Sequence, residues 1–197
     1  MNKADVKEPI GSYSGYTYAD YLKFSFDEMV ELIRGKIFKM TPAPSASHQR
    51  VSRELLVQIA DFLKGKKCEV FTAPFDVVLP VEGKSFEASD RVVQPDICVI
   101  CDASKIKEQG CFGAPDWIIE ILSPHTAKKD LQDKFSLYEE SGVREYWIVE
   151  PRNQTVEVFV LVKNNYQRVQ TYVHEDVVSP STLKGLKVSL GQVFEAI

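Results

Sequence analysis

The chain has 197 residues, with 24 lysines and arginines against 28 aspartates and glutamates, so its formal net charge is −4. Its 44% hydrophobic and 26% charged residues are typical of a globular protein and exclude a disordered, collagen-like or disulfide-dense small protein. The acidic balance disfavours a protein that coats nucleic acid through a general basic excess. No apolar run is as long as a membrane span, which needs about 18 residues. The first residues also lack the pattern of a signal peptide. We therefore expect a cytoplasmic protein without membrane contact.

The sequence predicts a flexible arm over residues 1–16 and a single domain over residues 17–197. A short helix is expected over 17–22, with Thr17 as its N-cap. Two apolar runs rich in β-branched residues then flank Arg34-Gly35, which predicts a hairpin over 28–40.

The clearest helix covers residues 45–64, where apolar side chains recur at three- and four-residue steps. Ser45 or Ser47 is suited to cap it, and Gly65 follows its end. Strands are expected next at 70–72 and 75–79. The polar, charged stretch that follows, over residues 81–91, predicts a mobile loop.

Residues 97–101 and 117–122 are short apolar runs without clean alternation, which is typical of strands that are covered on both faces. The remaining expected elements are a helix over 127–141 closed by Gly142, a strand at 145–149, a hairpin of 155–162 with 166–173, a strand at 186–188 and a short terminal helix. This order predicts one α/β (α+β) domain with a mixed central sheet flanked by helices.

Two carboxylates stand in or beside these apolar runs. Glu120 shares its strand face with Ile118 and Leu122, and an unpaired buried carboxylate costs several kcal/mol, so it must be protonated, paired or bound to a metal. Asp96 opens the run at 97–101 after Pro95; an Asp there often only bonds a backbone amide. Together, at adjacent strand ends, the two would repel each other, and either one raised pKa or one divalent cation would resolve that repulsion. Mg²⁺ often takes only one or two carboxylates besides water and phosphate.

Lys134 is the third candidate, because it lies beside the apolar stripe of its expected helix and its tip could extend into a cleft. The alternative is an ordinary helical ion pair with Asp130, four residues earlier. Glu31 repeats the pattern of a charge inside an apolar strand. His48, at the start of the long helix, is a candidate ligand, phosphate contact or cap, with a purely structural role as the alternative.

The four cysteines, without an export signal, are expected to be reduced. Cys98 and Cys101 have a zinc-like spacing, but no second such pair exists in the sequence, and structural zinc takes four ligands. Residues 98 and 101 also face opposite sides of a strand. Buried, unreactive thiols are therefore the favoured interpretation.

With these residues in hand, the chain resembles the Uma-type restriction endonucleases, long labelled a domain of unknown function and placed in the PD-(D/E)XK nuclease superfamily. The matching stretches include Glu31-Leu-Ile-Arg-Gly-Lys-Ile, Val93-Gln-Pro-Asp-Ile, Gly113-Ala-Pro-Asp-Trp-Ile-Ile-Glu-Ile-Leu-Ser-Pro, Lys134-Phe-Ser-Leu-Tyr and Gly142-Val-Arg-Glu-Tyr-Trp-Ile-Val-Glu-Pro. The resemblance runs from about Thr17 to the C-terminus, and it implies a restriction-endonuclease-like fold with N- and C-terminal hairpins.

The resemblance implies that Asp96 and Glu120 bind Mg²⁺ or Mn²⁺, which would polarise a scissile phosphate and activate a water. The superfamily's Lys normally stands two residues after the Glu, where this chain has Leu122. The resemblance suggests that Lys134 has taken over this role and that Glu31 is an additional acid near the metal.

The expected function is a metal-dependent DNA endonuclease. The alternatives are a nucleic-acid or protein binding module without turnover, and a hydrolase of small substrates, because the fold does not dictate the substrate. Lys128 and Lys129 are candidate phosphate contacts at a helix N-terminus, whereas residues 64–67 are expected to be a solvated basic face. Cleaving both strands of a duplex is easiest for a symmetric dimer, so a homodimer is a further expectation.

Overall fold

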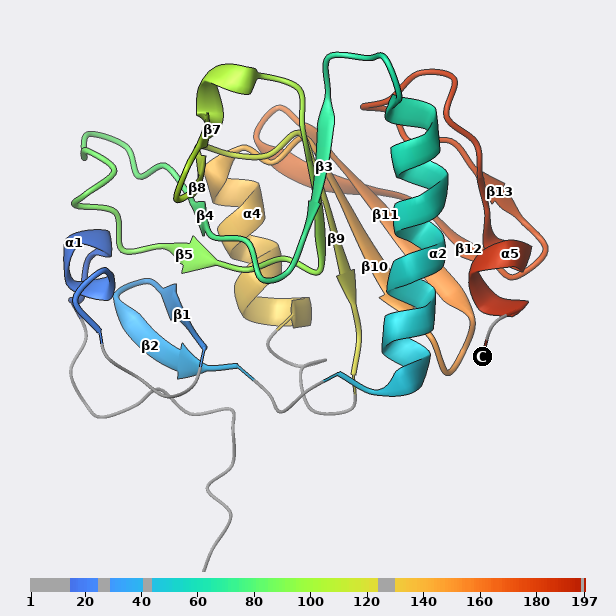
Figure 1. Cartoon of the computed structure of the whole chain (residues 1–197), viewed down its shortest axis with the longest axis horizontal. Helices are drawn as coiled ribbons and strands as arrows, with labels where there is room; N and C mark the ends of the chain where they lie inside the picture. Colours follow the sequence, from blue (N-terminus) through green and yellow to red (C-terminus); the bar gives the residue numbers. More distant parts are fainter. Residues whose placement is uncertain (1–14, 25–28, 41–43, 124–129, 196) are drawn as a thin grey trace, which may run out of the picture.

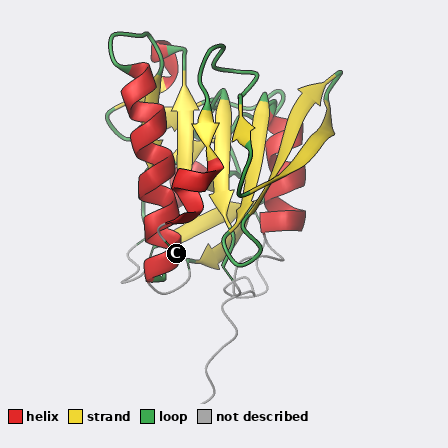
Figure 2. Ribbon diagram, turned by 90° about the vertical axis from the view of Figure 1, so that its right-hand side faces the viewer, coloured by secondary structure: helices red, strands yellow, loops and turns green. Residues whose placement is uncertain are grey.

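The protein is described here by a computed structural model, which covers residues 15–24, 29–40, 44–123, 130–195 and 197. Among these residues, helices pack on both sides of a central group of strands (Figure 2). The N-terminal arm expected over 1–16 lies outside the described residues up to position 14. No described helix is both long enough and apolar enough to cross a membrane.

The central sheet is mixed and follows the order β12-β11-β10-β9-β6-β3 (Figure 1). Only β9 and β10 run parallel; the other neighbouring strands are antiparallel. Its strands are β3 Glu69–Thr72, β6 Ile97–Ile100, β9 Trp117–Ile121, β10 Glu145–Glu150, β11 Thr155–Val162 and β12 Asn165–Val173. The mixed sheet flanked by helices is thus confirmed, and so is the C-terminal hairpin of β11 and β12.

A second mixed sheet, of order β2-β1-β5-β4-β8-β7, lies on one face of the first. Its strands are β1 Val30–Ile33, β2 Lys36–Lys39, β4 Val77–Val78, β5 Val92–Val93, β7 Ile106–Lys107 and β8 Gly110–Phe112. The predicted hairpin is confirmed, with Arg34 at φ 50° and Gly35 at φ 74° in its turn. Both central residues of such a tight hairpin turn need positive φ, which explains the glycine. A small third sheet pairs β13 Val177–Val178 with β14 Val188–Ser189.

Helix α2, Ala46–Leu63, and helix α5, Leu190–Glu195, cover one face of the central sheet, and α4, Phe135–Ser141, covers the other. The apolar core between α2, α5 and the sheet contains the odd-numbered side chains of β9, such as Trp117 and Ile119. The apolar core on the α4 side contains Ile118. Every residue of β6 and β9 is buried, so the prediction of strands covered on both faces is confirmed. Two further helical elements are α1, Tyr18–Tyr21, and the 3₁₀ turn η1, Ala103–Lys105.

The predicted second helix is divided. Residues 127–129 lie outside the described part, a π-helical turn, η2, covers Asp130–Lys134, and regular α4 begins at Phe135. Gly142 ends α4 at φ 84°, as its position predicted. Single π turns inside helices are rare overall, but those that occur are often found at functional sites. The π turn in this protein ends at Lys134.

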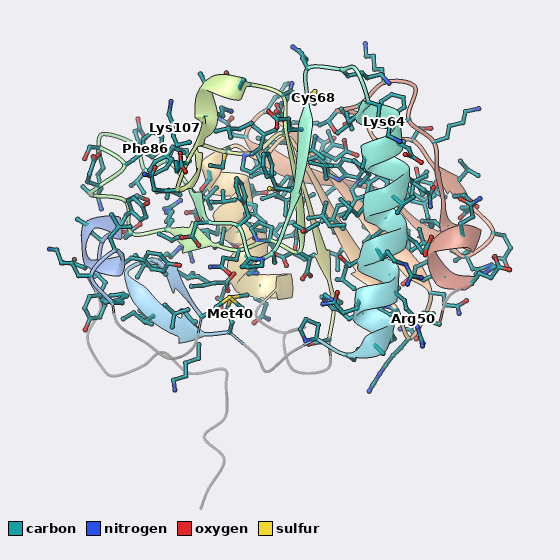
Figure 3. All side chains as sticks on the ribbon, viewed as in Figure 1. Met40, Arg50, Lys64, Cys68, Phe86 and Lys107 are labelled. Atoms are coloured by element: carbon teal, nitrogen blue, oxygen red, sulfur yellow. A yellow bond between two sulfur atoms is a disulfide. The ribbon has the colours of Figure 1, made fainter. Side chains whose placement is uncertain are left out.

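One prediction about the cysteines is wrong, because Cys68 and Cys101 form a disulfide across β3 and β6. Figure 3 labels Cys68 beside the upper end of β3. In the register of this antiparallel pair, Glu69 faces Ile100, so the next residues outward, 68 and 101, come together. Cys98 and Cys111 are free and buried, as predicted for unreactive thiols, and burial raises the pKa of the Cys111 thiol to about 12.

Candidate active site

Three segments far apart in the sequence bring two acids and one lysine together inside the protein. Lys134 Nζ lies 2.8 Å from Glu120 Oε1 and 3.0 Å from Glu31 Oε1. The side chains of Glu31, Glu120 and Lys134 are only 2%, 3% and 6% exposed. The ammonium group of Lys134 lies between the two carboxylates and offsets their mutual repulsion, which would otherwise be strong in a buried site.

Each member of this triad has a local reason for pointing inward. Glu31 and its neighbours on β1 are all buried, because both faces of β1 are covered: Val30 and Leu32 pack in one apolar cluster and Ile33 packs in another. Glu120 alternates along β9 with the side chains that face α2 and so points toward α4, as do Ile118 and Leu122. Lys134 ends the π turn that covers this face of the sheet (Figure 1).

Leu122, at the position where the superfamily pattern has its lysine, is buried and belongs to the apolar core on the α4 side. Its backbone N–H donates a hydrogen bond to the Val149 carbonyl oxygen at 2.8 Å. The ammonium group beside Glu120 therefore comes from Lys134, and the structure brings these two predicted residues into contact as the sequence suggested.

Asp96 lies immediately before β6 and bonds across to β9. Its Oδ2 accepts a hydrogen bond from the backbone N–H of Ile121 at 2.7 Å and lies 3.3 Å from His48 Nε2. The backbone-amide contact that was the structural alternative for Asp96 is thus present, and it joins Asp96 to the residue that follows Glu120. The Asp96 side chain remains 21% exposed, so the site has an edge that is open to solvent.

His48 has a different role from the cap considered from the sequence. The Oγ of Ser45 accepts a hydrogen bond from the backbone N–H of His48 at 3.2 Å, so Ser45 caps α2 and His48 supplies the capped amide. The His48 side chain, 9% exposed, points to Asp96 instead.

A cavity of about 230 Å³ lies beside His48 at the N-terminal end of α2. Ser45, Ser47, Leu122 and Arg152 are among its lining residues. It therefore combines hydroxyl groups, a guanidinium and a helix end, which suit an anion, with the carboxylate of Glu150, which disfavours one.

Tyr138 is a member of the site that the sequence pattern assigned only to an apolar stripe. Its hydroxyl donates to Glu120 Oε1 at 2.6 Å, and its side chain is fully buried. Burial, followed by the charges of Glu120 and Glu31, raises the pKa of this phenol well above its usual value. The only available signal was that Tyr138 follows Lys134 by four residues, one helical turn.

A second polar cluster supports Glu31. The backbone N–H of Gln94 donates to Glu31 Oε1 at 3.1 Å, while the Gln94 side-chain amide donates to Asp76 Oδ1 at 2.7 Å. The Tyr21 hydroxyl donates to the same Asp76 oxygen at 3.1 Å. Burial is the main cause of the raised pKa of Asp76. This cluster was not predicted, because its residues stand in short, irregular segments.

Lys128 and Lys129 lie outside the described residues, as does the side chain of Asp130. Lys64 and Arg50 mark opposite ends of α2 in Figure 3, with Lys64 at the end away from His48. Eighteen residues separate the ends of this helix, about 27 Å. The basic residues 64–67 are thus remote from the candidate site, in keeping with a solvated face.

Asp96 and Glu120 are the two carboxylates of the site that could hold a metal ion. In the ranges that the structure describes, no group of three or more His, Cys, Asp and Glu side chains is arranged to hold a metal. Zinc is disfavoured by this donor set, since it takes three or four such ligands. Asp96 and Glu120 on adjacent strands still fit Mg²⁺ or Mn²⁺, which often use one or two carboxylates together with water.

The mixed α+β fold is that of a protein described as a putative nuclease belonging to DUF820 from Anabaena variabilis. Its crystal structure superposes with a TM-score of 0.72 over 92% of this chain and 98% of that one, at 24% sequence identity. Residues 18–191 match the family model Uma2, described as a putative restriction endonuclease. The chain belongs to this family, which confirms the resemblance seen in its sequence. The uncharacterized protein slr1290 of Synechocystis sp. is 27% identical over 139 residues, 70% of this chain and 68% of that protein.

Proposed function

We propose that this protein is a Mg²⁺- or Mn²⁺-dependent endonuclease that hydrolyses DNA phosphodiester bonds through Asp96, Glu120 and Lys134. The observation that carries the proposal is the 2.8 Å contact between Lys134 and Glu120. It places an ammonium group beside the acid although position 122, the usual place for the lysine, is a leucine. Family membership and the nuclease-like fold support the same reaction class.

Asp96 and Glu120 would hold the cation. When bound, such an ion polarises the phosphate and lowers the pKa of a coordinated water. The chain's own residues supply the remaining requirements of hydrolysis, in which the water oxygen bonds to phosphorus and one ester oxygen leaves with a proton. Lys134 offsets the negative charge near Glu120 and can orient the water by hydrogen bonding. Glu31 holds Lys134 in place from its other side.

The cavity beside His48 is where we expect a backbone phosphate of the DNA. His48, Ser45 and Arg152 can donate hydrogen bonds to it, and Asp96 borders the same region through its contact with His48. Lys128 and Lys129 stay candidates for further phosphate contacts. Affinity for DNA should then fall steeply with salt, because each phosphate contact releases counterions. A homodimer acting on cytoplasmic duplex DNA would suit cleavage of both strands.

Glu120→Gln tests this proposal, because it removes the charge that would hold the metal while keeping the shape of the side chain. Wild type and variant, purified identically, are incubated with supercoiled plasmid and Mn²⁺. We expect nicking by the wild type and a loss of at least about 100-fold in the variant. Equal nicking by both proteins would indicate a contaminating nuclease or a different site. No nicking by either protein, over varied DNA and RNA, would count against the proposal.

A second candidate is a binding module on the same fold, with weak or no turnover. The observation that favours it is the tight burial of Lys134 between two acids, which limits its freedom to meet a substrate. DNA binding that needs no metal and survives Glu120→Gln, measured by fluorescence anisotropy, would support this alternative.

A further inference from the structure

Tyr138 and Lys134 both donate hydrogen bonds to one oxygen atom of Glu120. The distances to Glu120 Oε1 are 2.6 Å from the Tyr138 hydroxyl and 2.8 Å from Lys134 Nζ. The two donors come from consecutive turns of the same helical segment, one at the end of η2 and one within α4. Glu120 thus accepts two hydrogen bonds on the same oxygen atom. The helical backbone fixes the spacing of the two donors.

This arrangement restricts the carboxylate. Rotation about its Cγ–Cδ bond would move Oε1 away from both donors and break two charge-assisted hydrogen bonds, which are about twice as strong as neutral ones. The direction of the carboxylate is therefore defined before any cation arrives. Since ordering a mobile side chain is one of the free-energy costs of binding, a carboxylate that is already oriented binds a cation more tightly than a mobile one.

We infer that Tyr138 is a positioning residue that orients Glu120 for binding a divalent cation. This inference rests on the proposed function in that it takes Glu120 as a metal ligand. It goes beyond it by assigning a role to a residue outside the Asp, Glu and Lys of the motif. Partners that hydrogen-bond a metal-ligating carboxylate typically contribute 10–100-fold to metal affinity or activity.

The ring and the hydroxyl of Tyr138 have separable tasks. The ring packs edge-on against Tyr146, with centroids 5.2 Å apart at 71°, and belongs to the apolar core on the α4 side. A phenylalanine ring would fill the same space. The hydroxyl would be costly to bury without a partner, and within the described residues its hydrogen bond goes to Glu120.

Tyr138→Phe therefore isolates the hydroxyl. Its matched control is Tyr166→Phe, which removes a hydroxyl from a half-buried tyrosine of the same aromatic cluster whose bond goes to the Val143 carbonyl at 3.0 Å. Binding of Mn²⁺ alone is measured by isothermal titration calorimetry, without DNA. We expect about 10-fold weaker binding for Tyr138→Phe and unchanged binding for Tyr166→Phe. In a Glu120→Gln background, Tyr138→Phe should have no further effect on Mn²⁺ binding.

Equal Mn²⁺ affinity of Tyr138→Phe and wild type would overturn the inference. So would a Tyr138→Phe chain that fails to fold by circular dichroism, since the hydroxyl would then be structural. A wild type that binds no Mn²⁺ would overturn it as well, because Glu120 would have no cation to hold. A wild type that binds Mn²⁺ without cleaving nucleic acid would remove only the proposed function, and the comparison of affinities would still decide the role of Tyr138.

Discussion

Lys134 balances the charge of the candidate site, because its ammonium group is shared by two carboxylates that are almost inaccessible to water. A buried ion pair adds little net stability compared with an apolar replacement of the whole group. Removing one partner alone, however, leaves an uncompensated buried charge, which costs about 3–5 kcal/mol. The site is therefore electrostatically dependent on a single side chain.

Lys134→Met should lower the free energy of unfolding by about 3 kcal/mol at pH 7. The loss should shrink as the pH falls, since protonation of one carboxylate relieves the repulsion between Glu31 and Glu120. Adding Glu31→Gln should restore more than half of the loss, because one of the two charges is gone. Urea unfolding of the single and double variants measures this coupling.

The control for this series is Lys64→Met, which removes an exposed lysine paired with Asp61 at 2.7 Å. Exposed pairs contribute about 0–1 kcal/mol, so this variant should unfold almost as the wild type does. A loss for Lys134→Met no larger than that of Lys64→Met would show that the buried cluster is not held by its lysine.

The charged residues of the site could be found in the sequence because a charge within an apolar run needs a partner. This argument selected Glu31 and Glu120, whereas Lys134 was selected by its place beside the apolar stripe of its helix and by the family resemblance; the structure brings all three together. It could not select Tyr138, whose spacing fits an apolar helix face equally well. Gln94 was also missed, because its contribution to Glu31 is made by a backbone amide that every residue except proline possesses.

At the scale of elements, the first turn of α2 carries His48 and borders the cavity beside it. The position of this helix end therefore determines the geometry of that part of the site. Its 18 residues were predictable because one strong helical period runs along its length. The strands β5 and β7 have two residues each, too few for any period to develop. The π turn was unpredictable for another reason: its backbone depends on how the helix packs over the sheet.

Ser45→Ala should destabilise the protein by about 1 kcal/mol, since it removes the oxygen that accepts the His48 amide at the helix start. Ser47→Ala is the matched control, because Ser47 is half-buried within the helix and its hydroxyl contacts the Ser45 hydroxyl at 2.9 Å without accepting the His48 amide. We expect its effect to stay within about 0.5 kcal/mol. Thermal unfolding of both variants decides between the two serines, which the sequence left equivalent; a larger effect for Ser47 would assign the cap to the wrong residue.

At the scale of the whole molecule, one stretch of chain passes between the two large sheets. It carries Asp76, Gln94 and Asp96. The disulfide from Cys68 to Cys101 closes a loop with a sequence separation of 33 that contains all three residues. The sequence argument missed it because the absence of an export signal says nothing about which strands become neighbours. The register of β3 and β6, which places these cysteines opposite each other, arises only from the assembled sheet.

Closing a loop of this length restricts the unfolded chain and should stabilise the fold by about 3–4 kcal/mol. We therefore expect a reductant to lower the free energy of unfolding of the wild type by about 3 kcal/mol in urea titrations. The double variant Cys68→Ser, Cys101→Ser should show the lower stability under both conditions. Cys98 and Cys111 remain in that variant and serve as the internal control for other effects of the reductant. Equal stability of the oxidised and reduced wild type would mean that the two strands are held by their hydrogen bonds and the surrounding core, without any contribution from the bridge.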